Sequence, residues 1–202
     1  MIERMQAEHV DRVVETHLES FEGFFLSFLG AGFLRALYMG ACKDARTISF
    51  VYRTGAGDIA GFVMGAMNPA GFFSSLLKRD WWRFAAASAS GVLRRPSIIP
   101  RLARALLRPS QSPAGSDVAA LMSLGVSPGA QGRGAGTALV RAFVEEAGLR
   151  GASRVVLTTD RDGNEAVNGF YVKAGFMKAR EYATPEGRHM NEYVTEIRRR
   201  QG

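Results

Sequence analysis

A run of glycines after an apolar stretch is the pattern in this sequence that most directly suggests chemistry. Residues 119–126 are almost entirely apolar, residues 127–130 interrupt the run, and Gln131-Gly132-Arg133-Gly134-Ala135-Gly136 follows. A helical pattern then continues to residue 147. Glycines allow backbone N–H groups to turn toward a ligand, and the first N–H groups of a helix have no partner inside it. This strand–loop–helix pattern predicts a binding site for a phosphate-bearing ligand.

Two common phosphate-binding loops fit this stretch poorly. Gly129 and Gly134 have the spacing of a nucleotide P-loop, but Ala135 and Gly136 stand where Lys and Ser/Thr are required. The dinucleotide fingerprint is G-x-G-x-x-G, whereas Gly132, Gly134 and Gly136 give G-x-G-x-G. An ordinary glycine-rich turn is the remaining alternative, but three alternating glycines are more than such a turn needs.

A second pattern lies one predicted helix and one predicted strand further along the chain. Asn164 is followed seven residues later by Tyr171-Val172-Lys173-Ala174-Gly175-Phe176. Residues 131–136 and 164–176 together resemble the GNAT superfamily of N-acetyltransferases, whose acetyl-CoA signature is Gln/Arg-x-x-Gly-x-Gly/Ala. The resemblance covers the chain except residues 68–117. It implies an enzyme that transfers an acetyl group from acetyl-CoA to an amine by direct attack, with no metal.

The resemblance also implies roles for individual residues. Tyr171 would donate a proton to the departing thiolate, and Asn164 would cap a helix or contact CoA. The backbone of the central strand would pair with the pantetheine arm, and one N–H near Leu124 would polarise the thioester carbonyl. The expected strand contacts are Leu124, Gly125 and Val126. The expected pyrophosphate contacts are Gln131, Gly132, Arg133, Gly134, Ala135, Gly136 and Thr137.

No residue stands out as the general base that would deprotonate the amine. The central strand contains neither Asp nor Glu, although many relatives have one there. A chain of water molecules is an alternative to a side-chain base. An alternative to an enzyme is a CoA-binding module without catalytic activity. The candidate bases are His17, Glu22, Asp160, His189 and Glu192.

Apolar periodicity and turn residues predict the elements that position these residues. The predicted fold is α/β, with a mixed, mostly antiparallel sheet that is flanked by helices and splayed at the acetyl-CoA site. We treat residues 1–202 as one domain. Strands are predicted at 1–5, 47–53, 59–67, 119–126, 154–159, 176–182 and 189–197. Helices are predicted at 7–20, 24–43, 71–90, 98–108, 135–147 and 165–174.

Residues 68–117 interrupt this order and carry most of the net charge of +7, because they contain eight basic and only two acidic residues. We expect an inserted basic helical hairpin followed by a linker at 109–116. Three interpretations stay open: a lid over the acceptor, a peripheral membrane contact through residues 68–108, or simply an added helical hairpin or homodimer face with solvated arginines. A lid favours a small acidic acceptor, such as a phosphorylated or nucleotide-linked amine. A membrane contact favours an acyltransferase that uses longer acyl chains.

The composition of the chain narrows the possible compartments and partners of the protein. Cys42 is the only cysteine, so an internal disulfide is excluded and a reducing compartment is favoured. The N-terminal residues lack an apolar run of signal-peptide type, and we expect a cytoplasmic protein. The basic segment is hydrophobic and amphipathic, so we expect no nucleic-acid partner.

Overall fold

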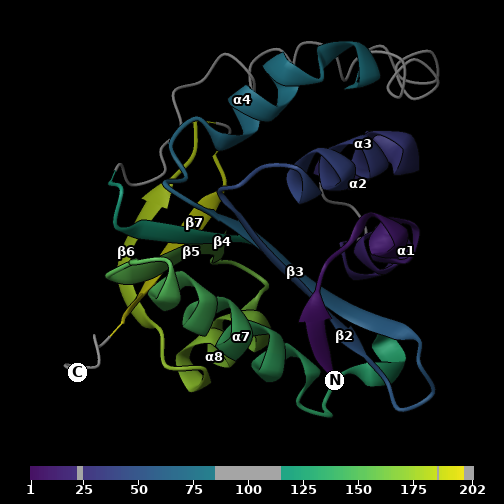
Figure 1. The fold of residues 1–202 in the computed structure, drawn as a ribbon. Coiled ribbons are helices and arrows are strands. Elements are labelled where there is room, and N and C mark those ends of the chain that lie inside the picture. Colours follow the sequence, from purple (N-terminus) through teal and green to yellow (C-terminus); the bar gives the residue numbers. More distant parts are fainter. Residues whose placement is uncertain (22–24, 85–114, 186, 198–202) are drawn as a thin grey trace.

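Seven strands form one mixed sheet in the computed structural model, which describes residues 1–21, 25–84, 115–185 and 187–197 (Figure 1). The strand order is β1-β2-β3-β4-β5-β7-β6. Among these strands only β4 and β5 run parallel, which confirms the predicted mostly antiparallel sheet. The strands are β1 (Ile2–Arg4), β2 (Thr47–Arg53), β3 (Ile59–Met67), β4 (Val118–Val126), β5 (Arg154–Asp160), β6 (Met177–Ala183) and β7 (His189–Glu196).

Helices cover both faces of the sheet (Figure 1). One face carries α1 (Val10–Ser20), α2 (Phe25–Phe28), α3 (Gly30–Cys42) and α4 (Phe72–Arg79). The other face carries α7 (Ala135–Leu149) and α8 (Glu165–Lys173). Two short 3-10 helices, η1 (Ala7–His9) and η3 (Pro128–Ala130), precede α1 and α7. None of the helices in the described ranges is long and apolar enough to cross a membrane.

Each face has its own apolar core. Under α7, the side chains of Leu139 and Phe143 are fully buried against strands β2 to β5. Their spacing of four residues places them on one side of the helix. Under α1 and α3, the buried side chains include Leu34, Tyr38 and Phe62. The central sheet is therefore buried on both faces, which explains why β3 is apolar along nearly its whole length.

The predicted helix at 24–43 is two helices. Gly30, the first residue of α3, adopts φ +84°, a left-handed conformation that the interior of a continuous α-helix does not contain. Gly30 therefore marks the break between the two helices.

The predicted helix at 71–90 is interrupted at Asp80. Helix α4 stops at Arg79, and residues 81–84 are helical again after Asp80. The rest of that prediction, the second helix at 98–108 and most of the linker at 109–116 lie outside the described residues.

Candidate active site

The sheet opens between its two parallel strands. Strands β4 and β5 pair over only three positions, Val118–Arg154, Ala119–Val155 and Ala120–Val156. Beyond Ala120, β4 stays paired with β3, and beyond Val156, β5 stays paired with β7. The two strands therefore diverge, and the edge of β4 that faces β5 has no strand partner among the described residues from position 121 onward.

The register shows which backbone groups of β4 face this gap. Ser127 N–H donates to the Ala60 carbonyl at 2.9 Å, so Ser127 faces β3. Backbone groups alternate in direction along a strand. Gly125 consequently faces β3, where it pairs with Phe62, while Leu124 and Val126 face the gap. Of the three strand contacts expected from the sequence, two thus have backbone groups available to an added strand.

Gly125 has a different reason to be glycine. A Cβ atom there would lie 2.7 Å from the Phe62 ring and 3.1 Å from Ser20 Oγ. The absence of a side chain lets α1 and Phe62 approach the central strand. The Val126 carbonyl faces the gap and accepts a hydrogen bond of 3.0 Å from Gln131 Nε2. Gln131, the first residue of the glycine motif, therefore fixes the loop to the end of β4.

The glycine loop ends in open helix N–H groups. Gly132 and Gly134 adopt φ +72° and +80°, and Gly134 is the N-cap of α7. The helical hydrogen bonds begin with Ala138 N–H to the Gly134 carbonyl at 2.9 Å. No side chain of the described residues caps this helix. The first-turn N–H groups of Ala135, Gly136 and Thr137 are consequently available to an anion.

Helix α8 brings the second motif against this loop. A Cβ atom on Gly136 would lie 3.3 Å from the Phe170 ring, so the start of α7 and the side of α8 are in close contact. Asn164 occupies the N-cap of α8, but its side chain does not cap the helix. Its Nδ2 instead donates to Thr159 Oγ1 at 2.7 Å and to the Asp160 carbonyl at 3.1 Å. Asn164 is thus at the predicted N-cap position, but its side chain is oriented by the end of β5 and does not accept a helix N–H group.

A polar network beneath this helix was not predicted from the sequence. Asn168 Nδ2 donates to the Asp160 carbonyl at 3.0 Å, and Asn168 Oδ1 accepts hydrogen bonds of 2.9 Å from Asn191 Nδ2 and Tyr193 Oη. Asn168 follows Asn164 by four residues, so both amides lie on one side of α8. The four-residue spacing of Asn164 and Asn168 is visible in the sequence, and it could have predicted that both amides act together.

Tyr171 lies in an aromatic cluster on the same helix. Its ring contacts Phe170, Phe176 and Tyr193. The side chain is 7% exposed, and burial raises the pKa of Tyr171 to about 12. The hydroxyl forms no hydrogen bond with any described residue. It therefore carries a proton at neutral pH and has an unused donor.

The five candidate bases differ in their surroundings. His17 is 2% exposed, and its Nδ1 lies 2.7 Å from the Tyr38 hydroxyl. Burial lowers the pKa of His17 to about 4. Because a base with so low a pKa binds protons weakly at neutral pH, His17 is a poor general base. Glu22 lies outside the described residues.

The other three candidates contact charged side chains. Both carboxylate oxygens of Asp160 accept hydrogen bonds from Arg188, at 2.6 to 3.1 Å. His189 is exposed and pairs with Asp162 at 2.8 Å. One oxygen of Glu192 pairs with Arg180 at 2.8 Å, and Glu192 lies opposite Thr158, on the strand next to the gap. No group of His, Cys, Asp and Glu in the described ranges has the arrangement of a metal site.

Comparison with known proteins agrees with the fold. A family model described as "Acetyltransferase (GNAT) family" matches residues 11–176. The chain belongs to this family. No curated protein sequence matches it significantly.

Solved structures of other family members have the same fold. The ribosomal-protein-alanine N-acetyltransferase from Brucella melitensis has 13% identity and a TM-score of 0.64, with 98% of this chain and 99% of that chain covered. Ard1 from Thermoplasma volcanium has 15% identity and a TM-score of 0.62, with 98% of each chain covered. The ribosomal-protein-S18-alanine N-acetyltransferase from Escherichia coli has 15% identity and a TM-score of 0.58, with 100% of this chain and 97% of that chain covered. At such low identities these likenesses show the fold alone.

Proposed function

We propose that this protein transfers the acetyl group of acetyl-CoA to the amine of a small acidic acceptor, such as a phosphorylated or nucleotide-linked amine. The observation that carries the proposal is the gap between β4 and β5, which ends at the glycine loop. An extended ligand that pairs with the free edge of β4 would direct a phosphate group onto the first N–H groups of α7. The pantetheine arm and pyrophosphate of acetyl-CoA have this combination of features.

The backbone supplies the contacts to this donor. Leu124 offers its N–H and carbonyl groups to the gap. Val126 offers its N–H group, because its carbonyl already accepts a hydrogen bond from Gln131. Acetyl-CoA supplies an activated thioester, and the Leu124 N–H group holds the carbonyl oxygen as negative charge develops on it. Gln131 to Thr137 surround the pyrophosphate, with Arg133 exposed beside the open amides.

Side chains account for the two proton transfers. The amine loses a proton as it attacks, and the departing sulfur gains one. Tyr171 keeps its proton at neutral pH and donates it to the sulfur. Glu192 accepts the proton of the amine through a bridging water, because it lies one strand away from the gap.

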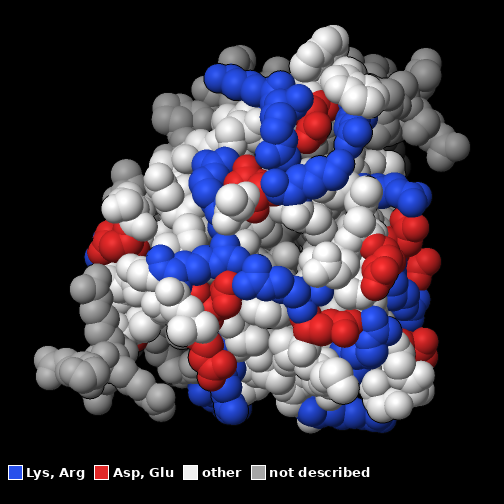
Figure 2. Space-filling view, viewed as in Figure 1, with Lys and Arg blue, Asp and Glu red and all other residues white. Residues whose placement is uncertain are grey.

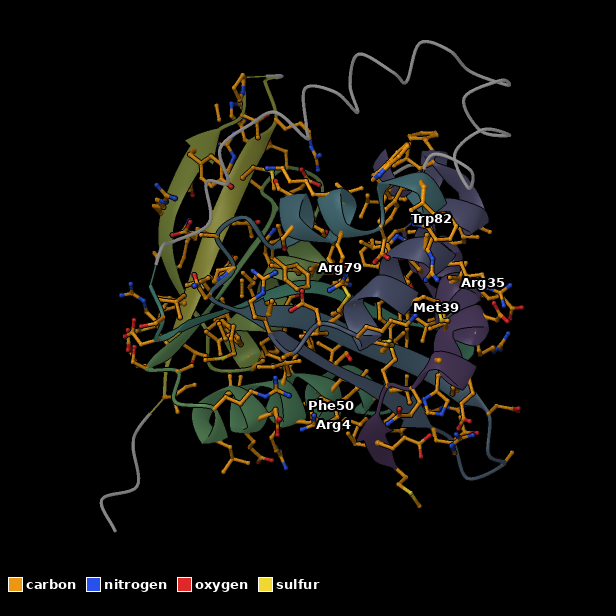
Figure 3. The ribbon with its side chains drawn as sticks, turned by 45° about the horizontal axis from the view of Figure 1, so that its top comes forward. Arg4, Arg35, Met39, Phe50, Arg79 and Trp82 are labelled. Carbon is orange, nitrogen blue, oxygen red and sulfur yellow. The ribbon has the colours of Figure 1, made fainter. Side chains whose placement is uncertain are left out.

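The charge of residues 68–117 supports an acidic acceptor. Within the described part, Arg79 is paired with Asp44 and Asp80, whereas Lys78 and Arg83 have no acidic partner among the described residues. Figure 3 shows Trp82 on the outer side of the short helix that follows α4. The unpaired charges of Lys78 and Arg83 favour a phosphate-bearing amine over a polyamine as the acceptor.

Release of free CoA thiol from acetyl-CoA tests the proposal. The assay would compare a nucleotide-linked amino sugar, a phosphorylated amine, an amino acid, an N-terminal peptide and spermidine. We expect faster release with the first two acceptors. Binding of acetyl-CoA without transfer to any amine would overturn the enzymatic proposal and support a CoA-binding module.

The substitution Tyr171→Phe removes only the proposed proton donor. General acid catalysis contributes about 100-fold or more to turnover, so we expect kcat to fall by about that factor. The Kd for acetyl-CoA should not change, as measured by calorimetry. Tyr182→Phe is the matched control, since Tyr182 lies on β6 and contacts Arg180. Equal turnover of the two variants at saturating acceptor would exclude Tyr171 as the acid.

A further inference from the structure

The packing of β4 determines the side from which an amine can reach the thioester. In the proposed function, on which this inference rests, the Leu124 N–H group holds the thioester carbonyl at the gap. On one face of the sheet, the side chains of Leu124 and Val126 pack against the apolar core under α7, which includes Leu139 and Phe143. Because that face is filled by side chains, an amine reaches the gap from the other face, which carries α1, α3 and α4 (Figure 1).

On this second face, the side chain of β4 beside the held carbonyl belongs to Ser123. Ser123 lies directly opposite Met64 of β3, and Met64 belongs to the core under α1 and α3. Residues that are directly opposite each other in paired strands have their side chains on the same face. Ser123 is therefore next to Leu124 in the chain and on the face from which the amine arrives.

Glu192, the proposed base, lies on the same face across the gap. Its neighbours Asn191 and Tyr193 both bond to Asn168 of α8. Because side chains alternate along a strand, Glu192 is on the opposite face from α8, which is the face of Ser123. Thr158 of β5 lies directly opposite Glu192 and separates it from the gap.

The strand register places Ser123 and Thr158 at the same level on the two sides of the gap. The last pair that joins the two strands is Ala120–Val156. Thr158 is two residues beyond Val156. Ser123 is three residues beyond Ala120, but one of these, Met122, is the extra residue of a β-bulge. An amine in the gap thus has Ser123 on one side and, one strand further on the other side, Glu192.

A buried hydrogen-bond chain holds the Ser123 side chain. Its hydroxyl is a hydrogen-bond partner of the Tyr38 hydroxyl, whose oxygen lies 2.7 Å from His17 Nδ1. Tyr38 is fully buried and His17 is 2% exposed, so the chain joins α1 and α3 to the central strand in the interior. A hydroxyl has one proton and two lone pairs. Tyr38 uses one of these three, and Ser123 Oγ therefore keeps at least one lone pair for an N–H donor.

We propose that Ser123 binds the acceptor amine and restricts the acceptor to primary amines. One N–H group of the amine donates to Ser123 Oγ, and the other points toward the water at Glu192. As the nitrogen bonds to the carbonyl carbon and the carbon–sulfur bond breaks, the proton that faces Glu192 leaves through that water. The sulfur receives the proton of Tyr171. The remaining N–H group stays on the amide nitrogen, and its bond to Ser123 strengthens while the nitrogen carries positive charge.

The basic side chains over α4 fit the acidic part of such an acceptor. Met122, next to Ser123, packs against the apolar cluster that contains Phe72 and Leu76 of α4. Figure 2 shows that Lys and Arg side chains gather over α4 at the top of the molecule. An amine bound at Ser123 can therefore direct its phosphate group toward α4.

Paired acceptors test the hydrogen bond to Ser123. A primary amine has one N–H group to lose and one to donate to Ser123, whereas its N-methyl derivative has only the one that is lost. The probes are the primary amines of the CoA-release assay, starting with O-phosphoethanolamine, each compared with its N-methyl derivative. Ser123→Ala should lower kcat/KM for the primary amine by about tenfold or more and leave that for the N-methyl amine nearly unchanged. The preference for primary amines should fall by the same factor, with an unchanged Kd for acetyl-CoA.

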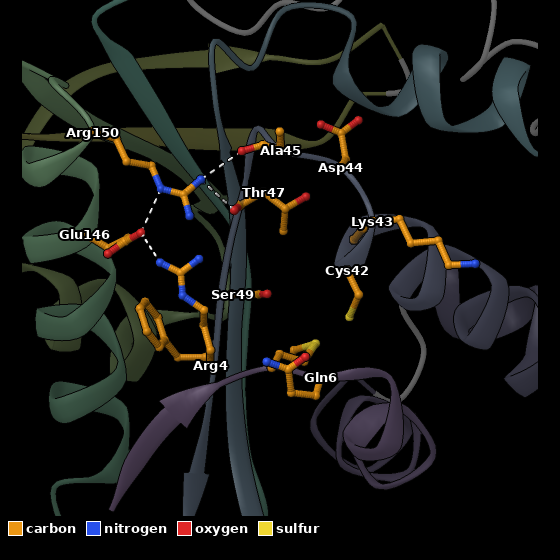
Figure 4. Close-up of a pocket in the computed structure, with 13 residues that line it drawn as sticks. Arg4, Gln6, Cys42, Lys43, Asp44, Ala45, Thr47, Ser49, Glu146 and Arg150 are labelled. Atoms are coloured by element: carbon orange, nitrogen blue, oxygen red, sulfur yellow. Dashed lines mark hydrogen bonds and ion pairs between the residues drawn. The ribbon is translucent and has the colours of Figure 1, made fainter.

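Two further variants separate this role from a structural one. Tyr38→Phe keeps the buried ring but frees the Ser123 hydroxyl, so it should reduce the preference by a smaller factor. Ser49→Ala is the matched control. Ser49 lies opposite Met64 on its other side, is 9% exposed where Ser123 is 8% exposed, and lines a separate cavity between β2, α3 and α7 (Figure 4). Its substitution should keep the preference of the parent.

Each outcome bears on one part of the proposal. A preference that Ser123→Ala abolishes, Tyr38→Phe weakens and Ser49→Ala keeps supports it. Equal losses for primary and N-methyl amines in Ser123→Ala would overturn it, because a structural defect slows both. A parent that binds acetyl-CoA but transfers to none of the primary amines would overturn the proposed function itself. If Ser123→Ala does not fold, as judged by its melting curve, the preference of Tyr38→Phe decides alone.

Discussion

At the scale of single residues, a buried hydrogen-bonded pair joins helices α1 and α3. His17 on α1 bonds to Tyr38 on α3, and the Ser123 hydroxyl of β4 acts on Tyr38 as a further hydrogen-bond partner. His17 was among the possible bases named from the sequence. Yet His17 follows Val13 by four residues and Val14 by three, which already places it on the buried face of α1. The apolar periodicity of α1 therefore predicts that His17 is buried, but it does not predict that Tyr38 is its partner.

The burial of His17 predicts sensitivity to acid. Its pKa is about 4 in the folded protein and 6.5 in the unfolded chain. Above pH 6.5 both states are neutral, whereas between 6.5 and 4 only the unfolded chain gains a proton. The free energy of unfolding should therefore fall by roughly 3 kcal/mol across this range. Urea unfolding of the parent and of His17→Gln at pH 7, 5.5 and 4.5 measures it.

Asp and Glu side chains also titrate between pH 6.5 and 4. The His17→Gln variant is therefore the reference that isolates the contribution of His17. If parent and His17→Gln lose the same stability between pH 7 and 4.5, His17 is not the cause.

At the scale of secondary-structure elements, the sequence predicted most strands and the two helices of the site. Alternation and glycine spacing are local properties, and β2 and β3 have the predicted bounds. The break at Gly30 and the bonds of the Asn164 side chain were not predicted. The break is a conformation that glycine permits but does not require, so the presence of Gly30 alone does not predict it. The Asn164 bonds reach Thr159 and Asp160, and they depend on how the end of β5 is placed against the start of α8. The gap after Ala120 was expected only by resemblance, since pairing cannot be read from composition.

The glycine loop gives a prediction at this scale. Gly134 has φ +80°, and a Cβ atom added there would meet none of the described residues within 4 Å, so Gly134→Ala changes backbone strain alone. We expect a loss of about 1 kcal/mol in stability and weaker binding of acetyl-CoA, because relief of the strain moves the Ala135 amide. Urea unfolding and calorimetry measure the two effects.

Gly129→Ala is the matched control for this substitution. It lies in the same loop, has no positive φ, and also has open space around it. Equal acetyl-CoA affinities for the two variants would show that the conformation at Gly134 does not position the anion site.

At the scale of the whole molecule, the sheet consists of two hydrogen-bonded units joined by three residue pairs. Strands β1 to β4 form one unit, and β5 to β7 form the other. Helix α7 packs across both units through Phe143 and its neighbours. A ligand in the gap would replace the missing ladder of β4, and it should therefore stiffen the connection between the units.

Amide hydrogen exchange tests this expectation. Acetyl-CoA at saturation should slow exchange at Leu124 and Val126, which face the gap, by about tenfold or more. Amides in the ladder between β2 and β3 should change less. Uniform slowing across the whole sheet would instead indicate global stabilisation without pairing at β4.

The position of β4 in the chain has a consequence for folding. Strands β2 and β3 are joined by residues 54–58, and β6 and β7 by residues 184–188, so each hairpin closes locally. Strand β4 must instead find β3 across residues 68–117 and β5 across residues 127–153. Such non-local pairings form slowly because the chain pays loop-closure entropy before it gains contacts. We therefore expect β4 to be placed after the two hairpins have formed, so that the gap beside it arises late in folding.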